Sequence, residues 1–146
     1  MREKEGKFLG EEMKRRLAFI RSHLVLIEKR QPEIVARYRN QLHQRIKTAE
    51  LDLGADDERL LKEVALFADR SDISEEVTRL KSHLEQVDYQ LRQTEPIGRT
   101  LDFLAQEMNR ELNTIGSKAN HAEVSQDVVQ MKAELEKIRE QIQNIE

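Results

Sequence analysis

Apolar residues recur at alternating spacings of three and four positions along most of the chain. The clearest stripes run over residues 13–27, 77–91, 97–115 and 124–145. This spacing places the apolar side chains of each segment on one helix face. Each stripe is narrow, so each helix is expected to bury a seam against one or two neighbours. The pattern predicts an all-α fold, namely an elongated antiparallel helical bundle with coiled-coil-like seams.

Helix-breaking and capping residues divide these stripes into five or six helices, and no segment predicts a strand. Pro32 predicts an end or a kink of the first helix, and a further stripe then runs over 34–46. More breaks are predicted at Gly54, Asp72, Pro96 and Gly116. Helix N-terminal caps are predicted at Asp56 or Asp57, at Asp72 with Glu75, and at Asn120 with Glu123.

The composition excludes several classes of protein. The 146 residues suffice for one domain, so we expect a single helical domain over 1–146. The absence of Cys excludes disulfides, thiolate metal sites and cysteine nucleophiles. No apolar run approaches the ~20 residues of a membrane helix, and no signal peptide follows Met1. We therefore expect a soluble, cytoplasmic protein without a membrane partner. Because no glycine-rich phosphate loop is present, no small-molecule cofactor is expected.

The net charge of −3 hides an asymmetry along the chain. Residues 1–47 carry a surplus of seven positive charges, and residues 48–96 carry a surplus of seven negative charges. A basic first third suits a polyanion or an acidic partner. The simpler alternative, which we expect, is that the 13–27 stripe packs on helices from the acidic segment.

Residues 98–120 are the least typical helical segment of the chain. One flank of their apolar stripe carries Asp102, Gln106, Asn109 and Asn113. Asn and Asp are poor helix formers, so a requirement other than helix propensity is expected to select them. The alternative is a polar seam that bonds to a neighbouring helix.

Two glutamates on the other flank form a candidate metal site. Glu107 and Glu111 lie one turn apart, with about 5–6 Å between their Cβ atoms. They can share a divalent cation when a third ligand arrives from elsewhere. His83, one turn after Arg79 beside the 77–91 stripe, is the candidate third group. An Arg next to a His also suits a phosphate site. The alternatives are a solvated glutamate pair and a histidine that serves packing.

Several segments resemble the C-terminal region of the YicC/YloC family of endoribonucleases. They are TRLKSHLEQ (78–86), GRTLDFLAQEMNRELNTIGSKAN (98–120) and QIQNIE (141–146), and ADRSDISEE (68–76) fits as well. The resemblance runs over essentially the whole chain. Members of that family carry an additional N-terminal domain, so the chain resembles an isolated C-terminal half. One position departs from the family, which usually has an acidic residue where this chain has His121.

The resemblance implies cleavage of single-stranded RNA, dependence on a divalent metal ion such as Mn²⁺ or Mg²⁺, and a homo-oligomer, specifically a hexamer. These implied properties are consistent with the candidate metal and phosphate sites described above. The candidate catalytic residues are His83, Glu107 and Glu111, and the candidate metal ligands are Glu107, Glu111 and Asp102. If His83 is not a ligand, it would be a general acid or base. The candidate RNA- and phosphate-binding residues are Arg79, Arg99, Arg110, Lys118, Asn109, Asn113 and Asn120.

The competing hypothesis is a non-catalytic helical module that serves oligomerisation or RNA binding within a larger ribonuclease. The two hypotheses differ in what they require of four side chains. A catalytic site requires Arg79, His83, Glu107 and Glu111 to converge in space. A scaffold would leave them scattered over solvated helix faces.

Overall fold

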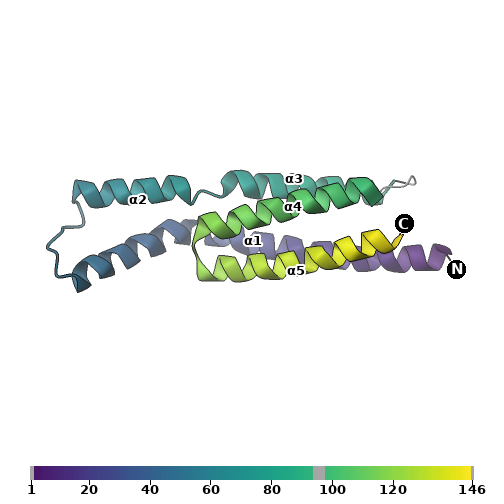
Figure 1. Ribbon diagram of the computed structural model, residues 1–146, viewed down its shortest axis with the longest axis horizontal. Coiled ribbons are helices and arrows are strands. Elements are labelled where there is room, and N and C mark those ends of the chain that lie inside the picture. Colours follow the sequence, from purple (N-terminus) through teal and green to yellow (C-terminus); the bar gives the residue numbers. More distant parts are fainter. Residues whose placement is uncertain (1, 94–97, 146) are drawn as a thin grey trace.

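The computed structural model describes residues 2–93 and 98–145, which form five α-helices and no strand (Figure 1). The helices are α1 (Arg2–Thr48), α2 (Glu58–Arg70), α3 (Ser74–Leu91), α4 (Gly98–Ala119) and α5 (Ala122–Ile145). The predicted all-α class is therefore confirmed. The break predicted at Pro96 lies outside the described residues.

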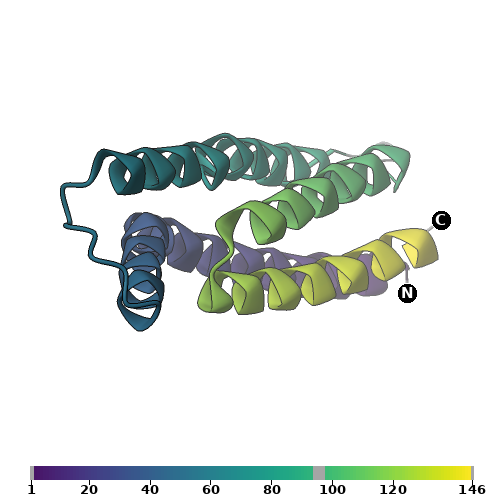
Figure 2. The same ribbon diagram turned by 60° about the vertical axis from the view of Figure 1, so that its left-hand side comes forward.

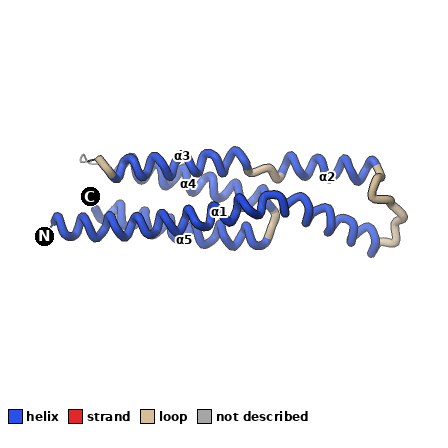
Figure 3. The backbone as a smooth tube through the Cα atoms, turned by 180° about the vertical axis from the view of Figure 1, so that it is seen from behind, coloured by secondary structure: helices blue, strands red, loops and turns tan. Residues whose placement is uncertain are grey.

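Four of the helices run side by side as an elongated antiparallel bundle. Helices α1, α3, α4 and α5 alternate in direction, and each packs lengthwise on its neighbours (Figure 1). Helix α2 continues the line of α3 beyond the end of this bundle, beside the last third of α1 (Figure 3). The turn between α4 and α5 ends the bundle on that side, so α2 and the end of α1 project past it.

The predicted stripes form one continuous core. Stripe residues from all five helices lie in a single cluster of buried side chains, and Leu80, Leu112, Ile115 and Met131 are fully buried within it. Leu42 and Ile46, at the end of the 34–46 stripe, are half-buried and lie outside this cluster. Helix α1 packs mainly on α5 and only to a smaller extent on α2 and α3. The prediction that its main neighbours are the helices of the acidic segment is therefore wrong. Ion pairs tie α1 to α3 as well, between Arg21 and Asp88 and between Glu28 and Lys81. Among the described residues, no helix is both long and apolar enough to span a bilayer.

The helix break predicted at Pro32 is absent, because α1 is one helix of 47 residues with Pro32 inside it. Proline in a helix interior removes one hydrogen bond and crowds the preceding turn, at a cost of about 3 kcal/mol. Ile27 and Ile34 on either side of it are both buried in the same core. Packing therefore holds the helix together through the proline. The last third of α1 turns away from the line of the rest, as helices commonly do at proline (Figure 2).

The predicted cap of α2 is confirmed, and the predicted start of α3 is found with different hydrogen bonds. Asp57 caps α2, since its carboxylate accepts the backbone N–H of Arg59. Before α3, Asp72 accepts both the N–H and the hydroxyl of Ser74. The predicted capping box is not what forms there, because Glu75 pairs with Arg79 one turn later.

The break predicted at Gly116 lies three residues too early. Helix α4 continues to the fully buried Ala119, and a Cβ at Gly116 would lie 3.5 Å from Val128 of α5. This glycine therefore marks a close approach of two helices. The turn is made by Asn120, whose φ of 46° is left-handed, and by His121, whose Nδ1 accepts the N–H of Val124. His121, and not Asn120, caps α5.

Candidate metal and phosphate site

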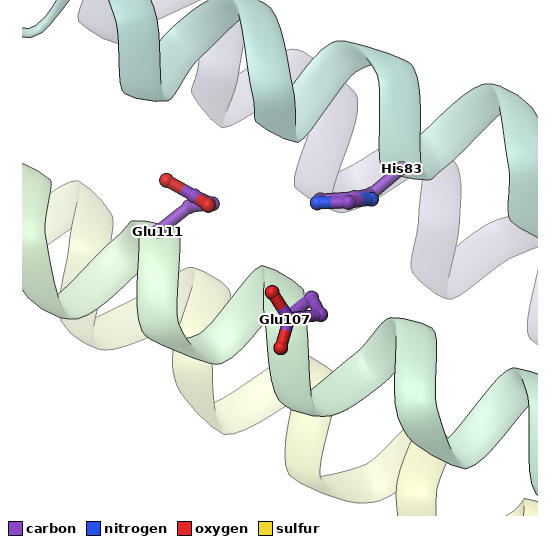
Figure 4. Close-up of side chains that lie close together, drawn as sticks. All are labelled: His83, Glu107 and Glu111. Atoms are coloured by element: carbon purple, nitrogen blue, oxygen red, sulfur yellow. The ribbon is translucent and has the colours of Figure 1, made fainter.

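The polar flanks of α3 and α4 face each other across the seam between these helices. Both helices carry their apolar stripe toward the core, so one polar flank of each borders the shared seam. His83 extends from α3, and Glu107 and Glu111 extend from α4 toward it (Figure 4). Arg79, also on α3, binds Glu111 across the seam. The convergence that a catalytic site requires of these four side chains is therefore confirmed.

His83, Glu107 and Glu111 form the centre of this cluster. One potential ligand atom from each, an imidazole nitrogen and two carboxylate oxygens, lies within 4.8 Å of the other two. Two ligands on opposite sides of a cation at about 2.2 Å would stand roughly 4.4 Å apart. Small rotations of the side chains are thus enough to bring the three atoms onto one ion.

The histidine in this cluster carries an unsatisfied nitrogen. Nδ1 of His83 is buried and has no hydrogen-bond partner among the described residues. A buried polar atom without a partner is costly, and in native proteins it commonly marks a functional position. The glutamates differ in exposure, with Glu111 buried and Glu107 half-buried. The donor set of one imidazole and two carboxylates fits a divalent cation.

Glu111 is held by Arg79 from across the seam. The Nε of Arg79 donates to both carboxylate oxygens of Glu111, at 3.1 Å each. This hydrogen bond raises the pKa of the Arg79 guanidinium above its ordinary value. The same guanidinium reaches Glu75 at 2.9 Å and Glu76 at 3.6 Å, so three carboxylates surround it.

Glu76 is a member of the cluster that the sequence analysis did not assign to the site. Its side chain is only 3% exposed, and its Oε1 accepts a hydrogen bond from Lys118 at 2.6 Å. Its Oε2 is buried without a partner among the described residues. Glu76, Arg79 and His83 are spaced by three and four residues, which places them on one flank of α3. That spacing could have identified Glu76 as a third acid of the seam.

The other polar flank of α4 faces α5, away from this cluster. Asp102 accepts hydrogen bonds from Gln106 and from Arg139 of α5, and Asn113 accepts one from Lys132. The alternative of a polar seam bonded to a neighbouring helix is therefore right for this flank. Asp102 does not belong to the group that could share an ion, so the structure does not bring it together with the other two proposed metal ligands.

The remaining candidates for RNA binding lie at different distances from the cluster. Arg110 is largely exposed and reaches within 4.0 Å of Glu107, at the edge of the site. Arg99 and Asn120 are exposed at opposite ends of α4, and Asn109 shares the flank of Asp102. Of this set, Arg79 binds Glu111, and Lys118 binds Glu76.

His121 lies outside this cluster. Its side chain is buried at the start of α5, close to Glu33, Glu123 and Arg37. Burial, reinforced by Arg37, lowers the pKa of His121 below its ordinary value. Arg37 also binds Glu123 and holds the pKa of that carboxyl at about 2. His121 therefore serves the α1/α5 packing and the helix start.

Comparison with known proteins identifies relatives of this chain. Residues 27–146 match the family model described as "Endoribonuclease YicC-like, C-terminal". The chain is 48% identical to the "Probable endoribonuclease YicC" of Clostridioides difficile (strain 630) and 37% identical to the protein of that name from Haemophilus influenzae. Each alignment covers 100% of this chain and 50% of the relative. The chain thus spans half the length of the curated relatives it matches.

Proposed function

Because the chain belongs to the YicC-like C-terminal family of endoribonucleases, we propose that it is the metal-dependent catalytic part of such a nuclease and cleaves single-stranded RNA by phosphodiester hydrolysis. The relatives support the nuclease class, and the polar seam between α3 and α4 supports the choice of site. The observation that carries the proposal is the convergence of one potential ligand atom from each of His83, Glu107 and Glu111 within 4.8 Å of one another.

The donor set favours Mn²⁺ over Mg²⁺. Mg²⁺ prefers oxygen ligands and retains most of its water, whereas an imidazole ligand suits a transition metal. A cation bound there would supply Lewis-acid stabilisation of charge on the phosphate and a water of lowered pKa. His83, Glu107 and Glu111 would hold it from two helices whose backbones are fixed by the core. That placement on rigid elements keeps the three ligand atoms in one geometry.

Positive side chains at the rim complete the proposed site. Arg110, exposed beside Glu107, would bind a phosphate of the RNA backbone next to the reacting one. Arg79, which binds Glu111, would approach the reacting phosphate itself. If His83 does not bind the cation, its unpartnered Nδ1 would act as a general acid or base instead.

The proposal includes a homo-oligomer, with a hexamer as the expected form. Large apolar side chains remain exposed in the single chain, at Phe19, Val25, Leu26, Tyr89, Phe103 and Val129. Exposed apolar side chains on several helices favour association with further copies. This observation also fits the competing hypothesis, a non-catalytic oligomerisation and RNA-binding module. Light scattering of the purified chain tests the assembly, and the following experiment separates the two functions.

The test of catalysis compares one carboxylate of the site with a matched carboxylate elsewhere. Purified chain is incubated with end-labelled single-stranded RNA, with Mn²⁺ or with EDTA. Glu107→Gln should abolish the Mn²⁺-dependent cleavage. Glu28→Gln is the control, because Glu28 is similarly exposed and also faces one cation, Lys81, outside the site. Cleavage that survives in Glu107→Gln would place the activity elsewhere, and RNA binding without cleavage in any variant would favour the non-catalytic module.

A further inference from the structure

Glu111 is a candidate metal ligand that Arg79 already binds. It supplies one of the three converging ligand atoms, and both of its oxygens accept from Nε of Arg79 at 3.1 Å. A carboxylate that binds a divalent cation gives up much of its charge to it. The guanidinium would also be repelled by that cation at a separation of a few ångströms. Arg79 and a divalent cation are therefore competitors for Glu111.

Arg79 has two other carboxylate partners that it can keep when it releases Glu111. Its terminal nitrogens already reach Glu75 and Glu76 on its own helix, at 2.9 Å and 3.6 Å. Its side chain is 44% exposed, so the guanidinium borders solvent at the mouth of the seam. A short rotation of its side chain would thus keep the guanidinium paired with Glu75 and Glu76 and turn its N–H groups toward solvent, next to the proposed catalytic centre.

We infer that Arg79 is the resident counter-ion of Glu111, and that it yields this carboxylate to the divalent cation and then binds the phosphodiester of the RNA. The inference rests on the proposed function and assigns to Arg79 a role in ordering its steps. Arginine is suited to the second task, because its planar fork matches two phosphate oxygens. Cation binding and phosphate binding are then coupled through one side chain.

The inference differs from a plain structural ion pair in what it predicts. In a structural pair, loss of the arginine leaves a buried carboxylate without a partner and does nothing else. If Arg79 is a competitor, its loss also opens Glu111 to metal. Lys81, two residues further along α3, provides the matched control, since its partner Glu28 lies outside the three-ligand group.

The first measurement is Mn²⁺ affinity by calorimetry, with the free ion followed by electron paramagnetic resonance. Arg79→Gln should bind Mn²⁺ at least threefold more tightly than wild type, and Lys81→Gln should match wild type. In EDTA, Arg79→Gln should have a lower thermal midpoint, and saturating Mn²⁺ should raise that midpoint by more than it raises the wild-type value.

The second measurement uses an uncleavable probe, a fluorescent 2′-O-methyl oligoribonucleotide. Mn²⁺ should increase the affinity of wild type for this probe at least fivefold over the value in EDTA. Arg79→Gln should retain less than half of that gain, although it holds the metal more tightly. Arg79→Lys keeps the charge without the fork and should fall between the two.

The outcomes separate this inference from the proposed function. If Arg79→Gln and wild type bind Mn²⁺ equally, or if the variant binds it more weakly, the competition is wrong while the metal site stands. If neither protein binds Mn²⁺, both proposals fall. If the variant binds Mn²⁺ more tightly and keeps the full gain in oligonucleotide affinity, Arg79 is a counter-ion that does not bind phosphate, which overturns the second half of the inference.

Discussion

Two seams of this bundle each bury a histidine among charged residues, yet they differ in how the charges are balanced. In the α1/α5 seam, Nδ1 of His23 lies 3.0 Å from Asp127, and Arg30 lies 3.5 Å from the same carboxylate. Phe19 packs against the imidazole, with ring centroids 4.4 Å apart. In the α3/α4 seam, Nδ1 of His83 has no partner among the described residues.

The two seams differ in which polar groups they bring together. Around Asp127, one carboxylate has two groups that can balance it. Around His83, Arg79 binds Glu111, Arg110 reaches only within 4.0 Å of Glu107, and Nδ1 of the imidazole has no partner among the described residues. Buried polar groups that only stabilise a fold are normally paired. Both seams hold buried polar atoms without a hydrogen-bond partner among the described residues, Oδ2 of Asp127 in one and Nδ1 of His83 in the other. What sets the α3/α4 seam apart is the convergence of three potential ligand atoms within 4.8 Å of one another, and that convergence supports the proposed metal site.

The largest expected effect contrasts the two histidines. His83→Ala should lower kcat/KM for RNA cleavage about 10³-fold, whether His83 is a ligand or an acid–base group. The thermal midpoint should stay near that of wild type, because a half-buried flank residue contributes little core packing. His23→Ala should keep its activity and lose stability. Equal losses of activity in the two variants would erase the distinction between the seams.

The next effect is on stability and belongs to the α1/α5 seam. Asp127→Ala removes the carboxylate that His23 and Arg30 share and leaves both without their partner. The free energy of unfolding should fall by about 3 kcal/mol, as measured by urea denaturation. Glu134→Ala serves as a comparison, since its partner Arg16 keeps a second carboxylate in Glu12. It should cost less, and a larger cost would show that the His23 cluster is not the critical pairing.

Metal binding should stabilise one seam only. At a free Mn²⁺ concentration of 100 times Kd, ligand linkage adds about 2.7 kcal/mol to the free energy of unfolding. Glu107→Gln should lose most of this gain, because it removes one of the three converging ligand atoms. Asp127→Ala should retain the gain on its lower baseline. Thermal unfolding with Mn²⁺ and with EDTA measures both, and a gain that persists in Glu107→Gln would place the metal elsewhere.

The smallest effect concerns pH and the end of the α1/α5 seam. The pKa of His121 is lowered in the folded state, so below about 6.5 the unfolded chain binds more protons than the folded one. The free energy of unfolding should therefore fall as the pH drops through 6.5 toward the folded pKa. His121→Asn keeps a capping side chain that does not titrate.

Urea midpoints at pH 7.5 and pH 5.5 provide the measurement. Wild type should lose more stability between the two values than His121→Asn does. The neighbouring charges of Glu33, Arg37 and Glu123 are present in both proteins, so the difference isolates the imidazole. An identical loss in the variant would mean that other groups carry the pH dependence.

Helix periodicity predicted most of the fold, and its errors have one physical origin. Helix ends were predicted from proline and glycine alone, without the tertiary packing around these residues. Pro32 lies between Ile27 and Ile34, whose burial against the bundle outweighs the missing hydrogen bond. Gly116 looked like a helix end, but it is the place where α4 approaches Val128 of α5. Propensity describes a segment alone, whereas both positions are decided by a neighbouring helix.

Residue spacing predicted which candidate site residues share one face of a helix. The spacing of Glu107 and Glu111 gave one flank of α4, and the spacing of Arg79 and His83 gave one flank of α3. Antiparallel packing then brought these flanks together. Asp102 lies apart from the other two proposed ligands, because an amphipathic helix has two polar flanks and periodicity does not tell which neighbour each flank faces. The burial of a carboxylate such as Glu76 is likewise a property of the packed seam.

The long first helix also has a mechanical consequence. Beyond Pro32, α1 runs for about 24 Å to Thr48, at roughly 1.5 Å per residue. Tyr38 ties this stretch to α2 by stacking on Phe67, with centroids 3.8 Å apart, and by a hydrogen bond to Glu63. The two helices thus form a cantilever rooted in the bundle. A rotation of about ten degrees at the proline would displace its tip by roughly 4 Å. A bend too small to disturb the core would in this way become a movement larger than the width of an atom.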